Sequence, residues 1–175
     1  MNTRKDVFSD WRVRQALIEA FNFEYINETQ NAGRQQRITS YFSNSILGMR
    51  EGAAKNSVLE LLQNSDQTQL PGTFEGYKLP KSNGSERNRA NMKKALKNLE
   101  AAGYKVVEGK LQNNKGSQFK FSILLRQGAK EYLSIAEIYS SALKRLGIDV
   151  QIELVDNSQY WERIKKLEFD MAPYS

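Results

Sequence analysis

The amino-acid sequence predicts an α/β fold, and this prediction rests on residues 118–156. Apolar and polar residues alternate in 119–126 and again in 148–154, a pattern typical of strands with one buried face. The segment between them has apolar residues at helical spacing: Tyr132, Ile135, Ala136, Tyr139, Ala142, Leu143 and Leu146. Two strands joined by one helix run parallel through a right-handed crossover, so we expect a β-α-β unit.

Two helices are expected near the start of the chain. Asp10 is a suitable N-cap for a helix with Val13, Ala16, Leu17, Ala20 and Phe21 on its buried face. Asn22 caps a second helix over 23–30, which ends at 31–33. Residues 34–48 have no clear period and are expected to form an ordered loop. Residues 53–63 look helical, with apolar contacts from Val58, Leu59, Leu61 and Leu62.

The middle of the chain changes in composition. Prolines and glycines interrupt residues 64–84, which predicts a long surface loop. Ser85 is then expected to cap a helix that ends at Gly103 and buries Met92, Ala95, Leu96, Leu99 and Ala102. Residues 104–111 read as a strand, and 113–116 as the turn of an antiparallel hairpin.

The end of the chain predicts a second crossover and a third strand. Asp156 caps a helix with Tyr160, Trp161, Ile164 and Leu167, and residues 169–174 begin a strand. Because both crossovers are expected to have the same hand, we expect both crossover helices on the same face of the sheet. The alternating strands agree, because strands covered on both faces are more continuously apolar. We expect a βαβαβ mixed sheet with helices packed mainly on one face.

Length and composition limit the classes of function. A chain of 175 residues has room for a single domain, which we divide into a helical segment 1–63, a long loop 64–84 and an α/β core 85–175. The net charge of +6 is spread along the chain. The sequence has no cysteine. It also has no histidine, which is the commonest general base and the commonest metal ligand. We find no catalytic constellation, metal site or cofactor motif.

The ends of the chain suggest an excised domain. Met1 stands directly before a polar stretch, and the first residues have no signal-peptide hydrophobic region. No apolar run reaches membrane-spanning length. The third predicted strand stops directly after Pro173 and Tyr174.

Four segments together resemble a known family. Residues 7–17 are similar to the F-x-D-x-R-V-R-x-A-L segment of bacterial extracellular solute-binding proteins of the peptide, nickel and opine type, the receptors of ATP-binding-cassette (ABC) importers. Residues 95–104 resemble the family's A-x-x-L-L-x-x-A-G-Y, residues 146–150 its L-G-I-x-V, and residues 169–171 its F-D-M. Order and spacing match over nearly the whole chain. Residues 20–24, 40–42, 80–84, 89–91 and 155–160 resemble the oligopeptide and microcin C branch.

The resemblance implies most of the C-terminal lobe of a two-lobed, type II-like periplasmic binding protein. Its implied role is that of a substrate-binding component, not an enzyme, which takes up an oligopeptide or peptide-like ligand in a cleft between lobes. The implied partners are that ligand, a membrane permease and the missing N-terminal lobe, in the periplasm. No cofactor and no nucleic acid are expected.

In such a lobe, ligand contacts are expected at the carboxyl ends of the parallel strands. Arg126, Gln127 and Gly128 follow the first strand. Arg126 can offer a forked donor to a peptide carboxylate or carbonyl, although a solvated strand-end arginine fits equally well. Asp156 and Asn157 are better explained as a helix cap.

Two other places supply candidate ligand contacts. Tyr174 and Ser175 lie at the corresponding end of the third strand. The resemblance implies that groups binding the peptide amino terminus often follow this strand. Ser40, Tyr41 and Phe42 lie in a loop that resembles one facing the cleft. The two aromatic residues could stack on ligand side chains, but for each of them core packing or lobe contact is the stronger alternative.

A small nucleic-acid-binding domain is the alternative function. Arg89, Lys93 and Lys97 recur at four-residue intervals and predict a basic stripe on one helix. No recognised nucleic-acid motif accompanies the stripe. A steep fall of affinity with salt would be its signature.

Overall fold

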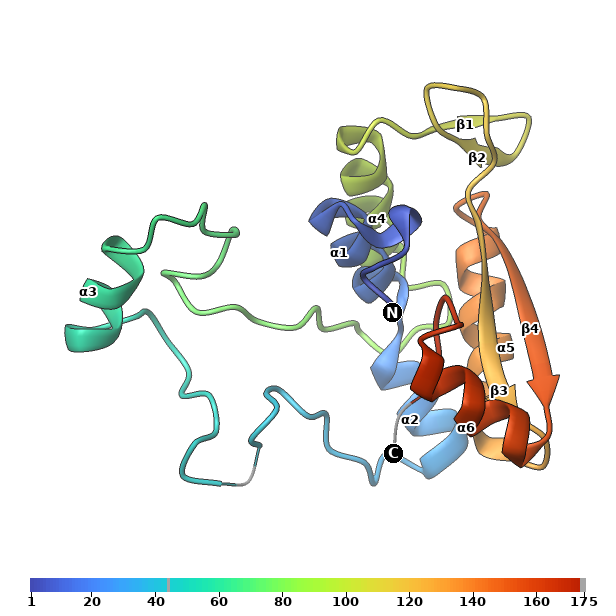
Figure 1. The fold of residues 1–175 in the computed structure, drawn as a ribbon, viewed down its shortest axis with the longest axis horizontal. Helices are drawn as coiled ribbons and strands as arrows, with labels where there is room; N and C mark the ends of the chain where they lie inside the picture. Colours follow the sequence, from blue (N-terminus) through green and yellow to red (C-terminus); the bar gives the residue numbers. More distant parts are fainter. Residues whose placement is uncertain (44, 174–175) are drawn as a thin grey trace. The chain divides into compact units, whose positions relative to one another are not determined.

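The computed structural model describes residues 1–43 and 45–173 (Figure 1). The chain divides into two compact units, one of residues 1–35 and 81–175 and the other of residues 36–80. The first unit contains the α/β fold, and the second is described separately below. Among the described residues, no helix combines the length and the apolar character needed to cross a membrane.

The centre of the first unit is the predicted β-α-β unit. Strands β3 (Lys120–Arg126) and β4 (Asp149–Val155) pair in parallel and are joined by helix α5 (Lys130–Lys144). Phe121 lies opposite Val150 and Leu125 opposite Leu154. The prediction from alternating and helical spacing is therefore confirmed.

The third predicted strand is reduced to a single bridge. Met171 pairs in parallel with Ile123 of β3. The backbone N–H of Leu124 donates to Met171 O at 2.8 Å, and the N–H of Met171 donates to Ser122 O at 3.1 Å. Because β3 also pairs with β4, it lies between β4 and Met171. Tyr174 falls outside the described residues.

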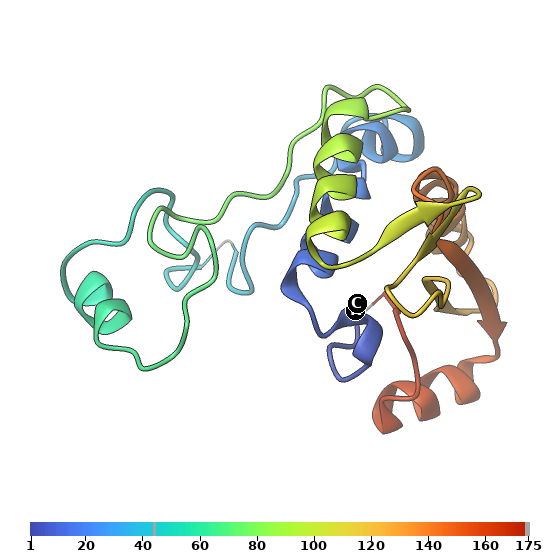
Figure 2. The same ribbon diagram turned by 90° about the horizontal axis from the view of Figure 1, so that it is seen from above.

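The two crossover helices lie on opposite faces of the sheet, so the expectation of one shared face is wrong. Helix α6 (Asn157–Lys166) lies in front of the β3–β4 pair and α5 behind it (Figures 1 and 2). The first connection runs from β3 outward to β4, whereas the second runs from β4 back past β3 to Met171. Two crossovers of one hand that run in opposite directions place their helices on opposite faces.

Strand β3 is consequently buried on both faces. All residues from Phe121 to Leu125 are buried, including Ser122 and Leu124, which the sequence pattern placed on an open face. Phe121, Ile123 and Leu125 belong to the main core. Helix α6 packs against β3 across the other face. The buried Ser122 hydroxyl has a partner there, because it donates to Asp170 Oδ2 at 3.4 Å, and the Ser122 backbone N–H donates to the same oxygen at 2.9 Å.

The N-terminal helices form as expected and complete the main core. Helix α1 (Trp11–Ala20) follows the short 3-10 helix η1 (Asp6–Phe8), and α2 (Phe23–Asn31) follows α1. Asp10 and Asn22 are the N-caps, each accepting a backbone N–H with its side chain. The Phe8 ring contacts the Phe121 ring edge-on, with centroids 5.3 Å apart.

Helix α4 (Arg89–Ala101) begins later than predicted. Its N-cap is Asn88, in a left-handed conformation, and not Ser85. The Ser85 hydroxyl and backbone N–H both donate to Asn83 Oδ1, so Ser85 closes a turn before the helix. The buried Asn88 side chain donates to Glu19 O of α1. This long-range contact, which the local sequence does not reveal, places the start of α4.

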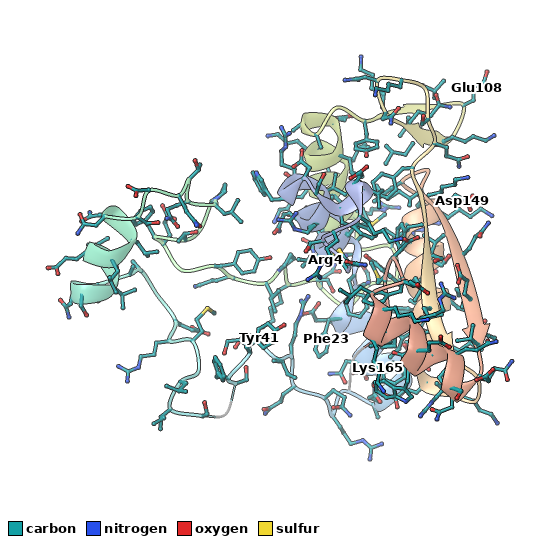
Figure 3. All side chains as sticks on the ribbon, in the orientation of Figure 1. Arg4, Phe23, Tyr41, Glu108, Asp149 and Lys165 are labelled. Carbon is teal, nitrogen blue, oxygen red and sulfur yellow. The ribbon has the colours of Figure 1, made fainter. Side chains whose placement is uncertain are left out.

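A tight turn divides the single strand predicted at 104–111. Strands β1 (Lys105–Val107) and β2 (Lys110–Gln112) form an antiparallel hairpin. Glu108 and Gly109 connect them with φ angles of +49° and +76°, the conformation of a two-residue hairpin turn. The predicted turn at 113–116 is present, and it leads to an antiparallel bridge between Gln112 and Gln118. Glu108 and Asp149, the first residue of β4, mark this end of the sheet in Figure 3.

Gly147 fixes the hairpin to the sheet. Its φ is +79°, and an added Cβ would lie 2.6 Å from the backbone nitrogen of Leu111. That nitrogen donates to Gly147 O at 2.8 Å. Glycine at this position therefore serves the close approach of two backbones in addition to ending the helix.

Among the described residues of the 36–80 unit, one segment is helical, α3 (Asn56–Gln63), which begins three residues later than predicted at 53. Of the four residues expected to make apolar contacts, Leu59 and Leu62 are half-buried, whereas Val58 and Leu61 are exposed. The N–H of Ala54 donates to Phe74 O at 2.7 Å. Gly76 packs against the backbone of Gly52, where an added Cβ would clash.

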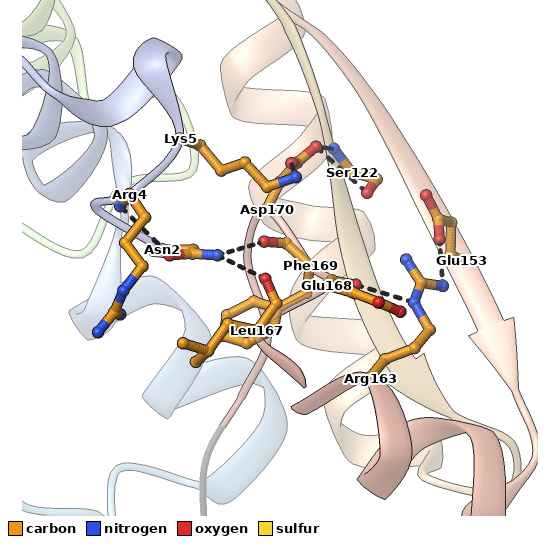
Figure 4. Close-up of polar contacts among 10 residues, drawn as sticks. All are labelled: Asn2, Arg4, Lys5, Ser122, Glu153, Arg163, Leu167, Glu168, Phe169 and Asp170. Carbon is orange, nitrogen blue, oxygen red and sulfur yellow. Dashed lines mark hydrogen bonds and ion pairs between the residues drawn. The ribbon is translucent and has the colours of Figure 1, made fainter. Parts of the chain in front are cut away.

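The segment before η1 holds the third strand in place (Figure 4). The buried Asn2 side chain donates to the backbone oxygens of Leu167 and Phe169, each at 2.9 Å. The Asn2 N–H donates to Asp170 O at 2.8 Å. Lys5 Nζ lies 3.6 Å from Asp170 Oδ1. One side chain thus satisfies two carbonyl groups that follow α6.

We predict that Asn2→Ala lowers the free energy of unfolding by about 1–3 kcal/mol, because two partly buried carbonyl oxygens lose their donor. Urea denaturation followed by circular dichroism measures the change. Asn64→Ala, at the exposed end of α3, is the control and is expected to have little effect. Equal effects of the two substitutions would contradict a specific role for Asn2.

A second prediction concerns Glu19, which is only 7% exposed between α1 and α4. Burial raises the pKa of its carboxyl group, while hydrogen bonds from Gln15 and Asn98 and the charge of Lys94 oppose this rise. The folded chain therefore holds the proton of Glu19 more tightly than the unfolded chain does. This contribution to stability is full below the unfolded pKa and is lost as the pH rises through the folded pKa.

Glu19→Gln should therefore stabilise the fold at neutral pH, and its advantage should shrink as the pH falls toward about 4, the ordinary range for this group. Urea denaturation at several pH values measures the difference. Glu100→Gln, an exposed carboxylate near the end of α4, is the matched control. An advantage of Glu19→Gln that does not change with pH would refute the explanation.

Candidate functional site

The candidate site lies at the carboxyl ends of β3 and β4. Arg126 ends β3 and Val155 ends β4, at the end of the sheet opposite the β1–β2 hairpin. The backbone N–H of Gln127 donates to Val155 O at 2.8 Å, so the chain stays paired for one residue beyond β3. Helices α5 and α6 both begin just after this edge. Their first turns therefore border the same place.

Arg126 and Asn157 are brought together here. Arg126 Nη1 donates to Asn157 Oδ1 at 3.1 Å, and both side chains are exposed. Asp156 caps α6 by accepting the Gln159 N–H, which confirms the predicted cap. Within residues 1–43 and 45–173, Arg126 makes no ion pair, and the group that accepts its hydrogen bond is a neutral amide. Asn157, which sequence reasoning treated as part of the cap, instead orients the arginine.

Gln127 and Gly128 have different roles in the turn to α5. Gly128 has a φ of +83°, and its N-terminal neighbour Gln127 is exposed. Lys130 N–H donates to Gly128 O at 2.9 Å within the turn, and the Leu133 N–H donates to Ala129 O at 3.0 Å as the first turn of the helix begins. Gly128 therefore supplies the left-handed conformation that the turn requires. The Gln127 amide is left at the surface beside Arg126.

Two tyrosines at this edge were missed by sequence reasoning. Tyr160 of α6 is buried, and its hydroxyl donates to Pro173 O, two residues beyond Met171. Burial raises the pKa of Tyr160, as does Tyr132, while the positive charge of Arg126 lowers it. Tyr132, in the first turn of α5, is 37% exposed. Both tyrosines had been assigned to apolar helix faces, since spacing alone does not distinguish a core aromatic from one at the end of a sheet.

The other candidate contacts fall elsewhere. Ser40, Tyr41 and Phe42 belong to the 36–80 unit. Ser40 Oγ accepts the Met49 N–H at 3.1 Å and lines a hollow of about 460 Å³ within that unit. Tyr41 and Phe42 are exposed. Tyr174 and Ser175 lie outside the described residues.

The chemistry of the edge is that of binding. Arg126, Gln127 and Asn157 present hydrogen-bond donors and acceptors, and Tyr132 presents an exposed aromatic surface. Among the described residues, no group of three histidine, cysteine or acidic side chains is placed to hold a metal ion. The predicted basic stripe of Arg89, Lys93 and Lys97 is exposed on α4, a separate helix that packs on α1.

Comparison with known proteins gives one consistent result. The model of "Bacterial extracellular solute-binding proteins, family 5 Middle" matches residues 1–175. The peptidoglycan-binding protein YepA of Agrobacterium fabrum is 33% identical over 171 residues, which cover 97% of this chain and 28% of YepA. The probable peptide-binding protein YejA of the same organism is 33% identical over 173 residues, covering 98% of this chain and 28% of YejA. The chain thus spans about 28% of the length of these relatives.

Solved structures share the fold. The oligopeptide-binding protein AppA from Bacillus subtilis, in complex with a nonapeptide, has a TM-score of 0.60 and 26% identity, over 93% of this chain and 26% of AppA. NikA from Brucella suis, in complex with Fe(III)-EDTA, has a TM-score of 0.65 at 19% identity, over 98% of this chain and 28% of NikA. The chain belongs to family 5 of the bacterial extracellular solute-binding proteins.

Proposed function

We propose that this chain forms most of the C-terminal lobe of the substrate-binding component of an ABC importer, and that the ligand is an oligopeptide or a peptide-like molecule. The observation that carries the proposal is the match of all 175 residues to the family, together with relatives named for binding peptide and peptidoglycan. The relatives are named as binding proteins and not as enzymes. The periplasm is the proposed location.

The edge formed by Arg126, Gln127, Asn157 and Tyr132 is the proposed ligand surface of this lobe. In open α/β sheets, ligands bind outside the carboxyl ends of the strands, and these residues lie at that end. Arg126 is held by Asn157 but keeps further guanidinium donors for a ligand carbonyl or carboxylate. Tyr132 offers an aromatic surface to a ligand side chain.

The proposed mechanism is capture between two lobes. A ligand that contacts this edge and a second lobe favours the closed arrangement, because only that arrangement makes both sets of contacts. Backbone hydrogen bonds to an extended peptide, with its side chains in hydrated pockets, would allow many sequences to bind. The closed form would then deliver the ligand to a membrane permease.

We predict that the 175-residue chain binds short peptides at least about 100-fold more weakly than the full-length protein does, since one of two linked binding surfaces is missing. Isothermal titration calorimetry with a defined set of synthetic peptides measures both affinities. Equal affinities would contradict binding between two lobes. A full-length protein that binds none of the peptides would contradict the proposed ligand class.

Arg126→Gln in the full-length protein should weaken peptide binding roughly 10- to 100-fold, because a hydrogen bond to a charged group contributes about 1.5–3 kcal/mol. Arg87→Gln removes an exposed arginine from the loop before α4 and serves as the control. The same titrations report both variants, and their thermal denaturation checks that the fold is intact. If the two variants bind alike, Arg126 is only a solvated residue.

A further inference from the structure

The 36–80 unit carries its large apolar side chains at its surface. Every described residue of this unit is at least partly exposed, whereas the first unit has a buried core. Six large apolar residues between positions 38 and 49 are each at least 44% exposed: Ile38, Tyr41, Phe42, Ile46, Leu47 and Met49. Singly scattered apolar residues are normal on a protein surface, but a concentration of this kind marks an interaction site. We call these residues the 38–49 surface.

The same stretch has no charged residue. Its sequence between Arg37 and Arg50 contains only apolar and uncharged polar side chains, in a protein with 26% charged residues. Loops that face water are rich in charged and polar residues. Loss of charge together with exposed aromatic and aliphatic side chains is instead typical of the centre of a protein–protein interface.

Internal hydrogen bonds shape the 38–49 surface without burying it. Ser43 Oγ accepts the Ser40 N–H at 3.0 Å, and Ser45 Oγ donates to Phe42 O at 2.8 Å. These serines close two consecutive turns with their own polar groups. The apolar side chains are therefore not needed to hold the turns, and Tyr41 and Ile46 stay 102% and 94% exposed. These side chains are therefore accessible to a partner.

Helix α3 points to the same conclusion independently. It has eight residues, none of them fully buried: Leu59 and Leu62 are half-buried, and Val58 and Leu61 are 55% and 73% exposed. A helix of this length is marginal in water unless an apolar face is packed. The 36–80 unit thus has two apolar surfaces and no core of its own to cover either.

We propose that the 38–49 surface docks against the part of the full-length protein that lies outside these 175 residues. The curated relatives that this chain matches are more than three times its length, since it covers 28% of them. Because that remainder belongs to the same polypeptide, it is present at a high effective concentration near the 38–49 surface. A permanent contact of this kind keeps the apolar side chains away from water. The inference rests on the two-lobed arrangement of the proposed function but is independent of the ligand.

Amide hydrogen exchange, measured by mass spectrometry without ligand, tests the proposal on the full-length protein and on the 175-residue chain. We expect peptides from 38–49 to exchange at least about tenfold more slowly in the full-length protein, with β3 protected alike in both. Fast exchange in both proteins would overturn the proposal. Equal protection in both proteins would also overturn the proposal, because either the first unit or a second copy of the chain would then cover the surface. Dilution of the 175-residue chain distinguishes these two explanations.

A variant of the full-length protein provides the second arm. Tyr41→Ser combined with Ile46→Ser should speed exchange across 38–49 about tenfold while β3 stays protected. Val107→Ser, an exposed apolar residue on β1, is the control and should change neither region. Unchanged exchange at 38–49 in the double variant would refute docking through these side chains. Protection of 38–49 in a protein that binds no peptide would sink the proposed ligand but leave the docking intact.

Discussion

The first unit depends on the burial of β3 from both sides. One face packs on the core that α1, α5 and η1 complete, and α6 covers the other. Its two edges pair with β4 and with Met171. A strand enclosed in this way cannot move or change register without exposing apolar residues on both faces, since a one-residue slip reverses the direction of every side chain. The positions of α5 and α6 follow from this enclosure.

The same enclosure creates the candidate site. Because the parallel strands end at one edge, and because α5 and α6 each start directly after a strand, the first turns of two helices on opposite faces meet at that edge. Arg126 then reaches Asn157 across the ends of β3 and β4, and Tyr160 joins the segment after Met171. The enclosed strand β3 thus gives Arg126 and Asn157 a rigid support, and a binding site with a defined geometry requires such a support.

The two units of the chain are stabilised in different ways. The first buries a contiguous set of apolar side chains and fixes its outer segments with specific contacts, such as those of Asn2 and Gly147. The 36–80 unit relies on turns closed by serines and on close backbone contacts, with its apolar residues facing outward. A segment that buries so little surface gains little hydrophobic stabilisation from its own contacts.

The sequence by itself determined the local structure and the family. Asp10, Asn22 and Asp156 cap the helices expected of them, because a cap bonds to backbone groups two or three residues away. The parallel pairing of β3 and β4 followed from the helix between them. The position of α6, the burial of Ser122 and the contact of Arg126 with Asn157 were decided only by tertiary structure. These depend on which edge of β3 accepts Met171, a pairing 48 residues apart that no local pattern specifies.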